Sequence, residues 1–320
     1  MTQFISRAYN NFEIDSKTKA IVIKSSPETR LKDEAEYYKT LPLELSVYFP
    51  RVLFSKFEND IYKVGMEYYA YDNLGSQMIK QPFSNTIWEQ VFNFIFTFIN
   101  NAKEYQLQKD TSDCRLMYID KTEKEYENLI KDFPFFTDLD KYDTIILNGK
   151  ELKTFRVLWP KIKQYIESNC LVDTLNYIHG DLCFSNILFG VNPINENVVL
   201  KFIDPRGSFG SVKSYGDPYY DLAKLMHSCD GGYEYFITDN FTISNNESTF
   251  KLQYSNDRKT QVNKVFDQVV REYGFDTKKI KLLQGTIFIG MCARHYDSFH
   301  RQKAMLLTGL KILNDVFETL

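Results

Sequence analysis

The stretch IHGDLCFSNILF, residues 178–189, places three polar side chains in an otherwise apolar segment. His179, Asp181 and Asn186 stand among Ile, Leu and Phe residues. A buried polar group costs free energy unless it has a hydrogen-bond partner. These three residues therefore need either partners inside the fold or a function.

The spacing of these residues indicates phosphoryl transfer. The pattern H-x-D-x-x-x-x-N has the Asp-to-Asn separation of the catalytic loop of protein kinases. In that chemistry a carboxylate accepts the proton of a hydroxyl, and a nearby amide oxygen holds Mg²⁺ against the phosphates. We assign the catalytic role to Asp181, together with His179, and the metal role to Asn186. The alternative is a polar turn in which Asp and Asn cap backbone groups.

A second acidic residue follows at the end of an apolar segment. Asp204 stands in LKFIDPRG, where four of the five residues 199–203 are apolar. In a kinase this position supplies a further Mg²⁺ ligand, the Asp of the D-F-G motif. The alternative is a turn Asp that ends a strand before Pro205. Two Asp-bearing segments in this order, joined by a hairpin, favour the metal site.

Together, HGDLCFSNILF, FIDPRG and GDPYYDLAKLMHS resemble the aminoglycoside phosphotransferase and choline kinase superfamily. The resemblance is closest to phosphotransferase-like proteins found with bacterial capsule and surface-sugar genes. It covers residues 175–230 and continues collinearly over about 20–70 and 292–313. It implies an α+β, bilobal protein-kinase-like fold. We expect a small β-rich N-terminal lobe, residues 1–70, that binds nucleotide, and a larger, mostly helical C-terminal lobe, residues 71–320, with the catalytic loop and acceptor site.

The hydrophobic pattern agrees with this division. Residues 19–24, 51–58 and 60–69 read as strands and 30–41 as a helix. Two short strands surround the polar loop at 176–207, and Asn148-Gly149 predicts a hairpin turn. The Asn- and Ser-rich residues 242–249 predict a surface loop. Apolar spacing of three and four predicts the remaining helices, at 86–106, 123–133, 154–170, 218–228, 259–273 and 301–320.

A kinase needs a strand lysine on the α- and β-phosphates and a helical glutamate that holds it. Lys24 ends the strand IVIK, which resembles the V-A-I-K signature. Glu34 lies on the apolar stripe of the following helix, whereas Glu36 points away, so we choose Glu34. The alternative for Lys24 is a surface lysine at a strand end.

The segments expected to hold the nucleotide depart from the kinase pattern at one point. GMEYYAY, residues 65–71, occupies the place of the hinge, so the backbone of Glu67, Tyr68 and Tyr69 would bind the adenine edge. A plain core strand followed by a turn is the alternative. Residues 4–16 contain no glycine where a phosphate-covering loop is expected. Backbone amides of Ser6 through Asn11 could reach the phosphates instead.

The D-F-G position reads Asp204-Pro205-Arg206-Gly207, and no A-P-E segment follows. Pro205 restricts the backbone, which argues against the activation switch and peptide groove of a protein kinase. Arg206 either holds a phosphate or acidic group of the substrate or pairs with a structural carboxylate. Asp221 resembles the family's Asp that supports the catalytic loop.

The resemblance places the acceptor near ARHYDSFHRQ, residues 293–302. His295 and Asp297 are its possible substrate contacts, with a helix-start His and a capping Asp as the alternatives.

Composition limits the other function classes. The 39 basic and 42 acidic residues are mixed along the chain, which does not favour a nucleic-acid partner. No apolar run is long enough to span a bilayer, and residues 1–16 lack the pattern of a signal peptide. The five cysteines form no C-x-x-C pair, which suggests reduced thiols and a cytoplasmic protein.

These observations predict a kinase that uses ATP and Mg²⁺ to phosphorylate a hydroxyl of a sugar or another polar metabolite, in capsule or surface polysaccharide synthesis. The alternatives are a non-catalytic nucleotide-binding protein and an AMP transferase on the same fold.

Overall fold

The structure, a computed structural model, describes residues 11–27, 29–192, 194–255 and 259–319. The chain divides into two compact units. The first unit is Met1–Leu107 with Asn176–Pro218, and the second is Gln108–Leu175 with Tyr219–Leu320. The predicted lobe boundary at residue 70 lies inside the first unit and stays a prediction.

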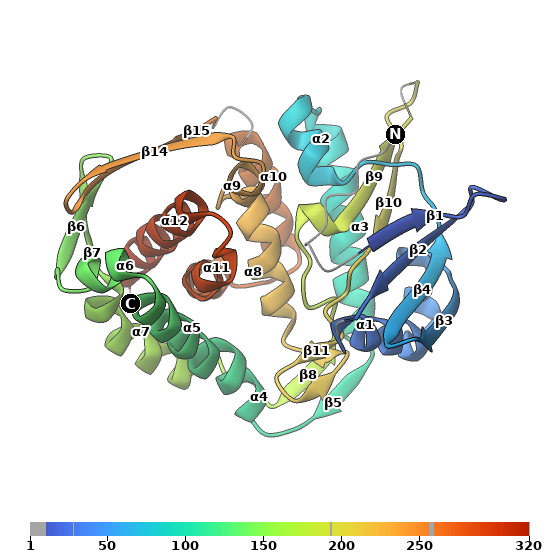
Figure 1. Cartoon of the computed structure of the whole chain (residues 1–320), viewed down its shortest axis with the longest axis horizontal. Coiled ribbons are helices and arrows are strands. Elements are labelled where there is room, and N and C mark those ends of the chain that lie inside the picture. Colours follow the sequence, from blue (N-terminus) through green and yellow to red (C-terminus); the bar gives the residue numbers. More distant parts are fainter. Residues whose placement is uncertain (1–10, 28, 193, 256–258, 320) are drawn as a thin grey trace. The chain divides into compact units, whose positions relative to one another are not determined.

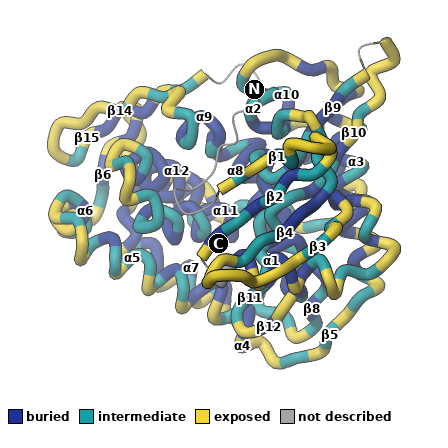
Figure 2. The backbone as a smooth tube through the Cα atoms, turned by 45° about the vertical axis from the view of Figure 1, so that its right-hand side comes forward, coloured by how far each residue is buried: buried dark blue, intermediate teal, exposed yellow. Residues whose placement is uncertain are grey.

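The first unit begins with an antiparallel sheet of order β1-β2-β4-β3 (Figure 1). Its strands are β1 (Asn11–Ile14), β2 (Ile21–Ser26), β3 (Val52–Glu58) and β4 (Ile61–Glu67). Helix α1 (Thr29–Thr40) packs Leu31 and Ala35 against Val22, Val64 and Met66. The middle strands β2 and β4 are more buried than the edge strand β3 (Figure 2). The predicted strands and helix are therefore present, because their apolar residues follow the period of each element.

The segment quoted at the outset forms a short 3₁₀ turn and a hairpin. The turn Phe184–Asn186 leads into β9 (Ile187–Val191), which pairs with β10 (Val198–Phe202). The polar loop therefore stands before one strand of the hairpin, and Asp204 stands after the other. The remaining elements of this region are the 3₁₀ helix Leu43–Tyr48, α2 (Leu74–Lys80), α3 (Asn85–Ala102), β5 (Gln106–Gln108), β8 (Thr174–Tyr177), β11 (Ser208–Phe209), β12 (Val212–Lys213) and β13 (Tyr215–Gly216).

Aromatic side chains form the core behind the hairpin. Phe202 at the end of β10 is fully buried. Its ring lies 5.1–6.1 Å, between centroids, from those of Tyr48, Phe49, Phe94, Phe98 and His179. Some of the many aromatic residues of the sequence therefore pack against one side of the polar loop, at His179.

The second unit contains most of the helices. Its strands form a mixed sheet of order β14-β15-β6-β7. The helices are α4 (Ser112–Arg115), the π-helical turn Leu116–Asp120, α5 (Lys121–Asp132), α6 (Pro134–Leu139), α7 (Phe155–Asn169), α8 (Pro218–Cys229), α9 (Tyr233–Ile237), α10 (Lys259–Glu272), α11 (Thr277–Met291), the 3₁₀ turn Cys292–His295 and α12 (Phe299–Phe317). The strands are β6 (Thr144–Leu147), β7 (Lys150–Lys153), β14 (Phe241–Asn246) and β15 (Thr249–Tyr254).

One predicted hairpin is confirmed and one predicted loop is wrong. β6 and β7 meet at Asn148-Gly149, whose positive φ angles of 50° and 84° suit a tight hairpin turn. Residues 242–249, expected to be a loop, instead form most of β14 and its turn into β15. The Asn and Ser side chains there are largely exposed, while Phe250 and Leu252 of the partner strand are buried. Backbone pairing with β15 thus outweighs the local loop preference.

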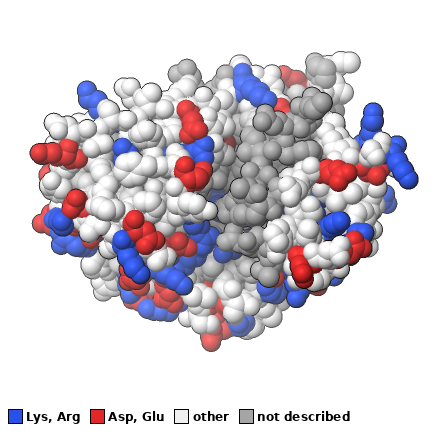
Figure 3. Space-filling view, viewed as in Figure 1, with Lys and Arg blue, Asp and Glu red and all other residues white. Residues whose placement is uncertain are grey.

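The surface agrees with the even charge balance of the sequence. Basic and acidic side chains are interspersed over the face shown in Figure 3. Each helix in the described part of the chain is too short or too polar to span a bilayer.

Phe202 tests the aromatic core. We expect Phe202→Ala to lower the free energy of unfolding by about 3–5 kcal/mol, because it leaves a cavity among large rings. Urea denaturation measures the change. Val199→Ala on the same strand is the control, since Val199 is 43% exposed. Equal effects of the two substitutions would contradict the assignment of Phe202 to the core.

Candidate active site

A buried ammonium group shared by two carboxylates lies within the first unit. Lys24 Nζ is 2.6 Å from Glu34 Oε2 and 2.6 Å from Asp204 Oδ1. Lys24 and Glu34 are 4% and 5% exposed, whereas the Asp204 side chain is 39% exposed. Strand β2, helix α1 and the segment after β10 therefore each contribute one charged group.

Helix geometry selects the glutamate that pairs with Lys24. Glu34 lies on the buried face of α1 with Leu31 and Ala35. Glu36 is exposed and pairs with Lys39 instead, at 2.7 Å. The sequence did not single out Phe12, whose ring lies under Lys24 Nζ at 5.8 Å and whose backbone pairs with that of Lys24. The alternation of polar and apolar residues along β1 is the sequence signal that could have identified Phe12.

The shared ammonium changes the acidity of its neighbours. Burial raises the pKa of the Glu34 carboxyl to about 7; Lys24 opposes this shift and the Asp204 carboxylate adds to it. Burial also disfavours the charge of Lys24, but Glu34 and Asp204 together raise its pKa above the usual value. Two carboxylates on one ammonium group leave a net negative charge, which together with burial favours the protonated form of Glu34.

The loop that carries Asp181 is held by His179. His179 Nε2 lies 3.0 Å from the carbonyl oxygen of Ile203, and the Asp181 amide donates to His179 Nδ1 at 3.2 Å. Because Nδ1 accepts, Nε2 carries the proton and donates. The ring is fully buried and stacks on Phe49 at 6.0 Å between centroids. His179 thus joins the Asp181 loop to the segment before Asp204.

The Asn186 side chain is fixed through its amide nitrogen. Its Nδ2 donates to the Asp181 carbonyl oxygen at 2.8 Å, which leaves Oδ1 as the atom that can bind a cation. Ile203 N donates to the Asn186 carbonyl oxygen at 3.0 Å, so Asn186 and Asp204 stand on adjacent chain segments. An amide oxygen and a carboxylate are the hard oxygen ligands that Mg²⁺ prefers. The residues present therefore fit this ion.

Backbone conformation fixes the D-P-R-G segment. Asp204 has a left-handed φ of 56°, and Gly207 has a φ of 72°. A Cβ on Gly207 would lie 2.5 Å from the Asp33 carbonyl oxygen of α1, so this position requires glycine. Lys213 also reaches Asp33 at 2.8 Å. Helix α1 is therefore packed directly against the segment that carries Asp204.

The residues predicted to contact adenine lie at and just after the end of β4. The Glu67 amide donates to the Arg51 carbonyl and the Tyr68 amide to the Ala20 carbonyl, at 3.0 and 2.8 Å. Tyr69 follows the end of β4, and its hydroxyl donates to Glu67 at 3.4 Å. Their role toward adenine stays a prediction.

Arg206 donates its amide to the His179 carbonyl at 2.9 Å, and its Cβ lies against Gly180. Its proposed contact with a substrate stays a prediction. Of the segment expected to cover the phosphates, residues up to 10 lie outside the described part of the chain.

The remaining predicted residues, Asp221, His295 and Asp297, belong to the second unit. Asp221 is buried in the first turn of α8. His295 ends the 3₁₀ turn before α12, and its carbonyl accepts from the Ser298 amide. Asp297 pairs with Arg301 at 3.0 Å.

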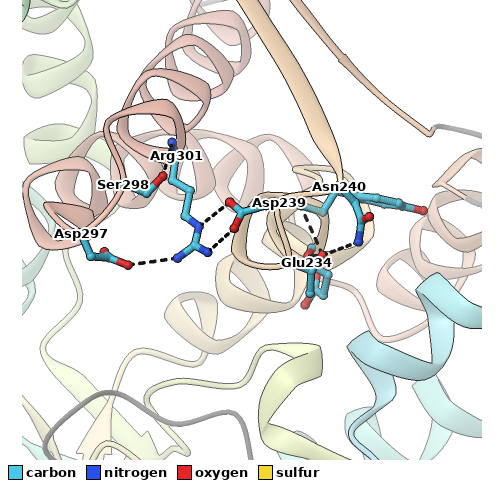
Figure 4. A network of polar contacts seen from close by, with 8 residues as sticks. Glu234, Asp239, Asn240, Asp297, Ser298 and Arg301 are labelled. Atoms are coloured by element: carbon cyan, nitrogen blue, oxygen red, sulfur yellow. Dashed lines mark hydrogen bonds and ion pairs between the residues drawn. The ribbon is translucent and has the colours of Figure 1, made fainter.

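Arg301 lies between Asp297 and Asp239 in a polar network (Figure 4). Its guanidinium makes two hydrogen bonds to Asp239, at 2.9 and 2.7 Å, besides the one to Asp297. Asp297 is therefore part of an ion-pair network rather than an isolated acid. The substrate roles of His295 and Asp297, and the supporting role of Asp221, stay predictions.

No protein-family model matches the chain, and no curated protein matches it in sequence. Solved structures do share its fold. The GDP complex of a mutant aminoglycoside 2'-phosphotransferase-IIIa superposes with a TM-score of 0.57 at 14% identity, over 99% of this chain and 90% of that one. A thermostable mutant of aminoglycoside phosphotransferase APH(4)-Ia, in ternary complex with AMP-PNP and hygromycin B, gives 0.56 at 11%, over 97% and 95%. ADP-bound APH(2'')-Ib gives 0.52 at 16%, over 97% and 93%. The predicted α+β, protein-kinase-like fold is confirmed.

Glu34 makes stability depend on pH. Its pKa rises from 4.5 to about 7 on folding, so the folded state binds a proton more tightly than the unfolded state. The free energy of unfolding should therefore fall as pH rises from 4.5 to about 7, by on the order of 3 kcal/mol. Denaturation of wild type and Glu34→Gln across this range isolates the effect, because the variant lacks this titration.

Two further variants make that test specific. Glu36→Gln is the control, since Glu36 is exposed, and its pH profile should match that of wild type. Asp204→Asn removes one negative charge beside Glu34, so the fall should end at a lower pH. A Glu34→Gln profile parallel to wild type would show that Glu34 does not titrate in this range.

Proposed function

We propose that this chain is an ATP- and Mg²⁺-dependent phosphotransferase that moves a γ-phosphoryl group to the hydroxyl of a small polar molecule. One observation carries the proposal. The Lys24–Glu34–Asp204 ion pairs and the Asp181–Asn186 loop lie in the same compact unit, joined by the His179 and Ile203 hydrogen bonds. The similarity to solved phosphotransferases supports the fold on which this reading depends.

Each group has a distinct role in the proposed reaction. Lys24, held by Glu34, neutralises charge on the nucleotide phosphates. Asn186 Oδ1 and the Asp204 carboxylate would hold Mg²⁺, which would neutralise charge on the phosphates. Because the transition state of phosphoryl transfer is loose, positioning and charge neutralisation supply most of the acceleration.

Asp181 orients the acceptor hydroxyl and takes its proton. His179 has both ring nitrogens occupied and is fully buried, so it acts as a positioning residue for Asp181. At the hinge, the Glu67 and Tyr68 amides already donate to the sheet. Adenine recognition would therefore fall on Tyr69 and on carbonyl groups of this segment.

The acceptor we propose is a sugar, a sugar derivative or another polar metabolite used in surface polysaccharide synthesis. This part rests on the sequence resemblance alone. We also propose a cytoplasmic location, which the five cysteines support, since all are buried and none forms a disulfide.

Two other functions use the same fold. Nucleotide binding without transfer is favoured by the D-P-R-G sequence and by the lack of glycine in residues 4–16. Transfer of AMP is the second. Parallel assays with γ-labelled and α-labelled ATP separate them, since phosphoryl transfer labels the product only from the γ position and AMP transfer only from the α position.

Asp181 tests the proposed chemistry. With γ-labelled ATP, Mg²⁺ and a pool of sugars and polar metabolites, wild type should label a small molecule. Asp181→Ala should lower turnover by about 10²–10⁴-fold, because it removes the proton acceptor, while affinity for Mg·ATP stays largely intact. Asp138→Ala, at a 70% exposed side chain, is the control. Loss of ATP binding in Asp181→Ala would contradict the assigned role.

Asn186 tests the proposed metal site. Asn186→Ala should raise the Mg²⁺ concentration needed for half-maximal ATP binding by about tenfold or more, because it removes one of two protein ligands. Calorimetric titration of ATP at graded Mg²⁺ measures this. Asn169→Ala, at an exposed helix end, is the control. An unchanged Mg²⁺ requirement would remove Asn186 from the metal site.

A further inference from the structure

The Asp204 carboxylate has two cationic partners that compete for it. Its Oδ1 accepts from Lys24 Nζ at 2.6 Å, and the same carboxylate is the proposed Mg²⁺ ligand beside Asn186. An ammonium group and a divalent cation repel each other at close range, and each needs the negative charge of Asp204. The lysine proposed to neutralise the phosphates therefore also opposes the binding of a metal ion at Asp204.

The surroundings of Lys24 hold its ammonium group next to Asp204. The Lys24 side chain is 5% exposed, whereas that of Asp204 is 39% exposed. Lys24 Nζ also lies 2.6 Å from Glu34 Oε2 and 5.8 Å from the centroid of the Phe12 ring. A carboxylate and an aromatic ring thus stabilise the charge in this position. A cation that approaches Asp204 from solvent would meet a carboxylate that is already paired.

The backbone of Asp204 is fixed, so any release of the ion pair has to come from the lysine. The amide of Ile203, the preceding residue, donates to the Asn186 carbonyl oxygen at 3.0 Å. On the other side, a Cβ on Gly207 would collide with the backbone of α1. Lys24 differs, because its ammonium group is carried by a flexible four-carbon stem. A small movement of that stem would free the Asp204 carboxylate.

Glu34 has an acceptor atom that can take up the donor released by Asp204. Glu34 Oε2 accepts from Lys24 Nζ, whereas Oε1 is buried and has no hydrogen-bond partner in the part of the chain that the structure describes. A buried carboxylate oxygen without a partner is unfavourable. Because an ammonium group has three N–H donors, the N–H that leaves Asp204 can turn to Glu34 Oε1 while Lys24 stays buried.

We infer that Lys24 keeps free divalent cations off Asp204 and releases this carboxylate when nucleotide phosphates attract the ammonium group. The released N–H turns to Glu34 Oε1, and the metal ion binds together with the nucleotide. This inference rests on the proposed function, which assigns Lys24 to the phosphates and Asp204 to the metal. It adds that Lys24 makes metal binding conditional on nucleotide.

Metal binding with and without nucleotide tests the inference. The probe is Mn²⁺, which prefers the same oxygen ligands as Mg²⁺, and the electron paramagnetic resonance signal of the free ion measures its binding. Lys24→Met/Glu34→Gln removes the ammonium group and its buried carboxylate together, so neither is left unpaired. We expect this variant to bind Mn²⁺ without nucleotide at least about tenfold more tightly than wild type, because the nearby positive charge is gone.

The same double variant should bind the nucleotide analogue AMP-PNP about tenfold more weakly than wild type, because it lacks a charged hydrogen-bond donor to the phosphates. Tighter metal binding and weaker nucleotide binding in one variant are not the result expected from a general loss of structure. Circular dichroism shows that each variant is folded.

Matched variants assign the effect to Lys24 and Asp204. Glu34→Gln alone keeps the lysine and should bind Mn²⁺ no more tightly than wild type. Adding Asp204→Asn to the double variant should abolish the gain. Lys213→Met should leave Mn²⁺ binding unchanged, because Lys213 pairs with Asp33, at 2.8 Å, and its side chain is 61% exposed.

The outcomes separate this inference from the proposed function. If the double variant binds Mn²⁺ without nucleotide no more tightly than Glu34→Gln does, while wild type binds Mn²⁺ in the presence of AMP-PNP, the inference is overturned and the proposed function stands. If wild type binds neither AMP-PNP nor Mn²⁺ in its presence, the proposed function fails, and the inference fails with it.

Discussion

The first unit depends on one buried ammonium group shared by two carboxylates. Taking Lys24 out of water is costly, and only closely placed negative charges compensate for it. Those charges come from Glu34, ten residues along the chain, and from Asp204, 180 residues away. The interaction can form only when β2, α1 and the segment after β10 have all reached their places. The two ion pairs therefore form only in the assembled unit, and they fix the positions of its polar groups relative to one another.

The surrounding structure is arranged to keep that geometry. Gly207 lets α1 approach the Asp204 segment, and His179 ties the Asp181 loop to the residue before Asp204. Phe49 and Phe202 cover the imidazole on its apolar sides. A polar site thus rests on an aromatic core. Because this core buries His179, both of its ring nitrogens need hydrogen-bond partners, which the Ile203 carbonyl and the Asp181 amide supply.

Much of the first unit could be predicted from the sequence, because its strands and helix follow the local spacing of apolar residues. The strand that ends near Lys24, helix α1 and the β9–β10 hairpin follow from apolar spacing, and the position of Glu34 on α1 follows from helix geometry. The pairing of 242–246 with β15 could not be predicted, because Asn and Ser favour loops locally and only the partner strand reverses that preference. The approach of Asp33 to Gly207 depends on a contact between distant segments, which no periodicity signals.

The left-handed backbone at Asp204 has a consequence for how this chain can change. With φ at 56°, the position tolerates glycine, asparagine and aspartate far better than other residues, because a larger or branched side chain would strain the backbone. Asparagine keeps the shape of aspartate and loses only its charge. The backbone therefore limits this position to few residues, and the substitution that best keeps its shape would remove one of the two carboxylates that compensate the buried Lys24.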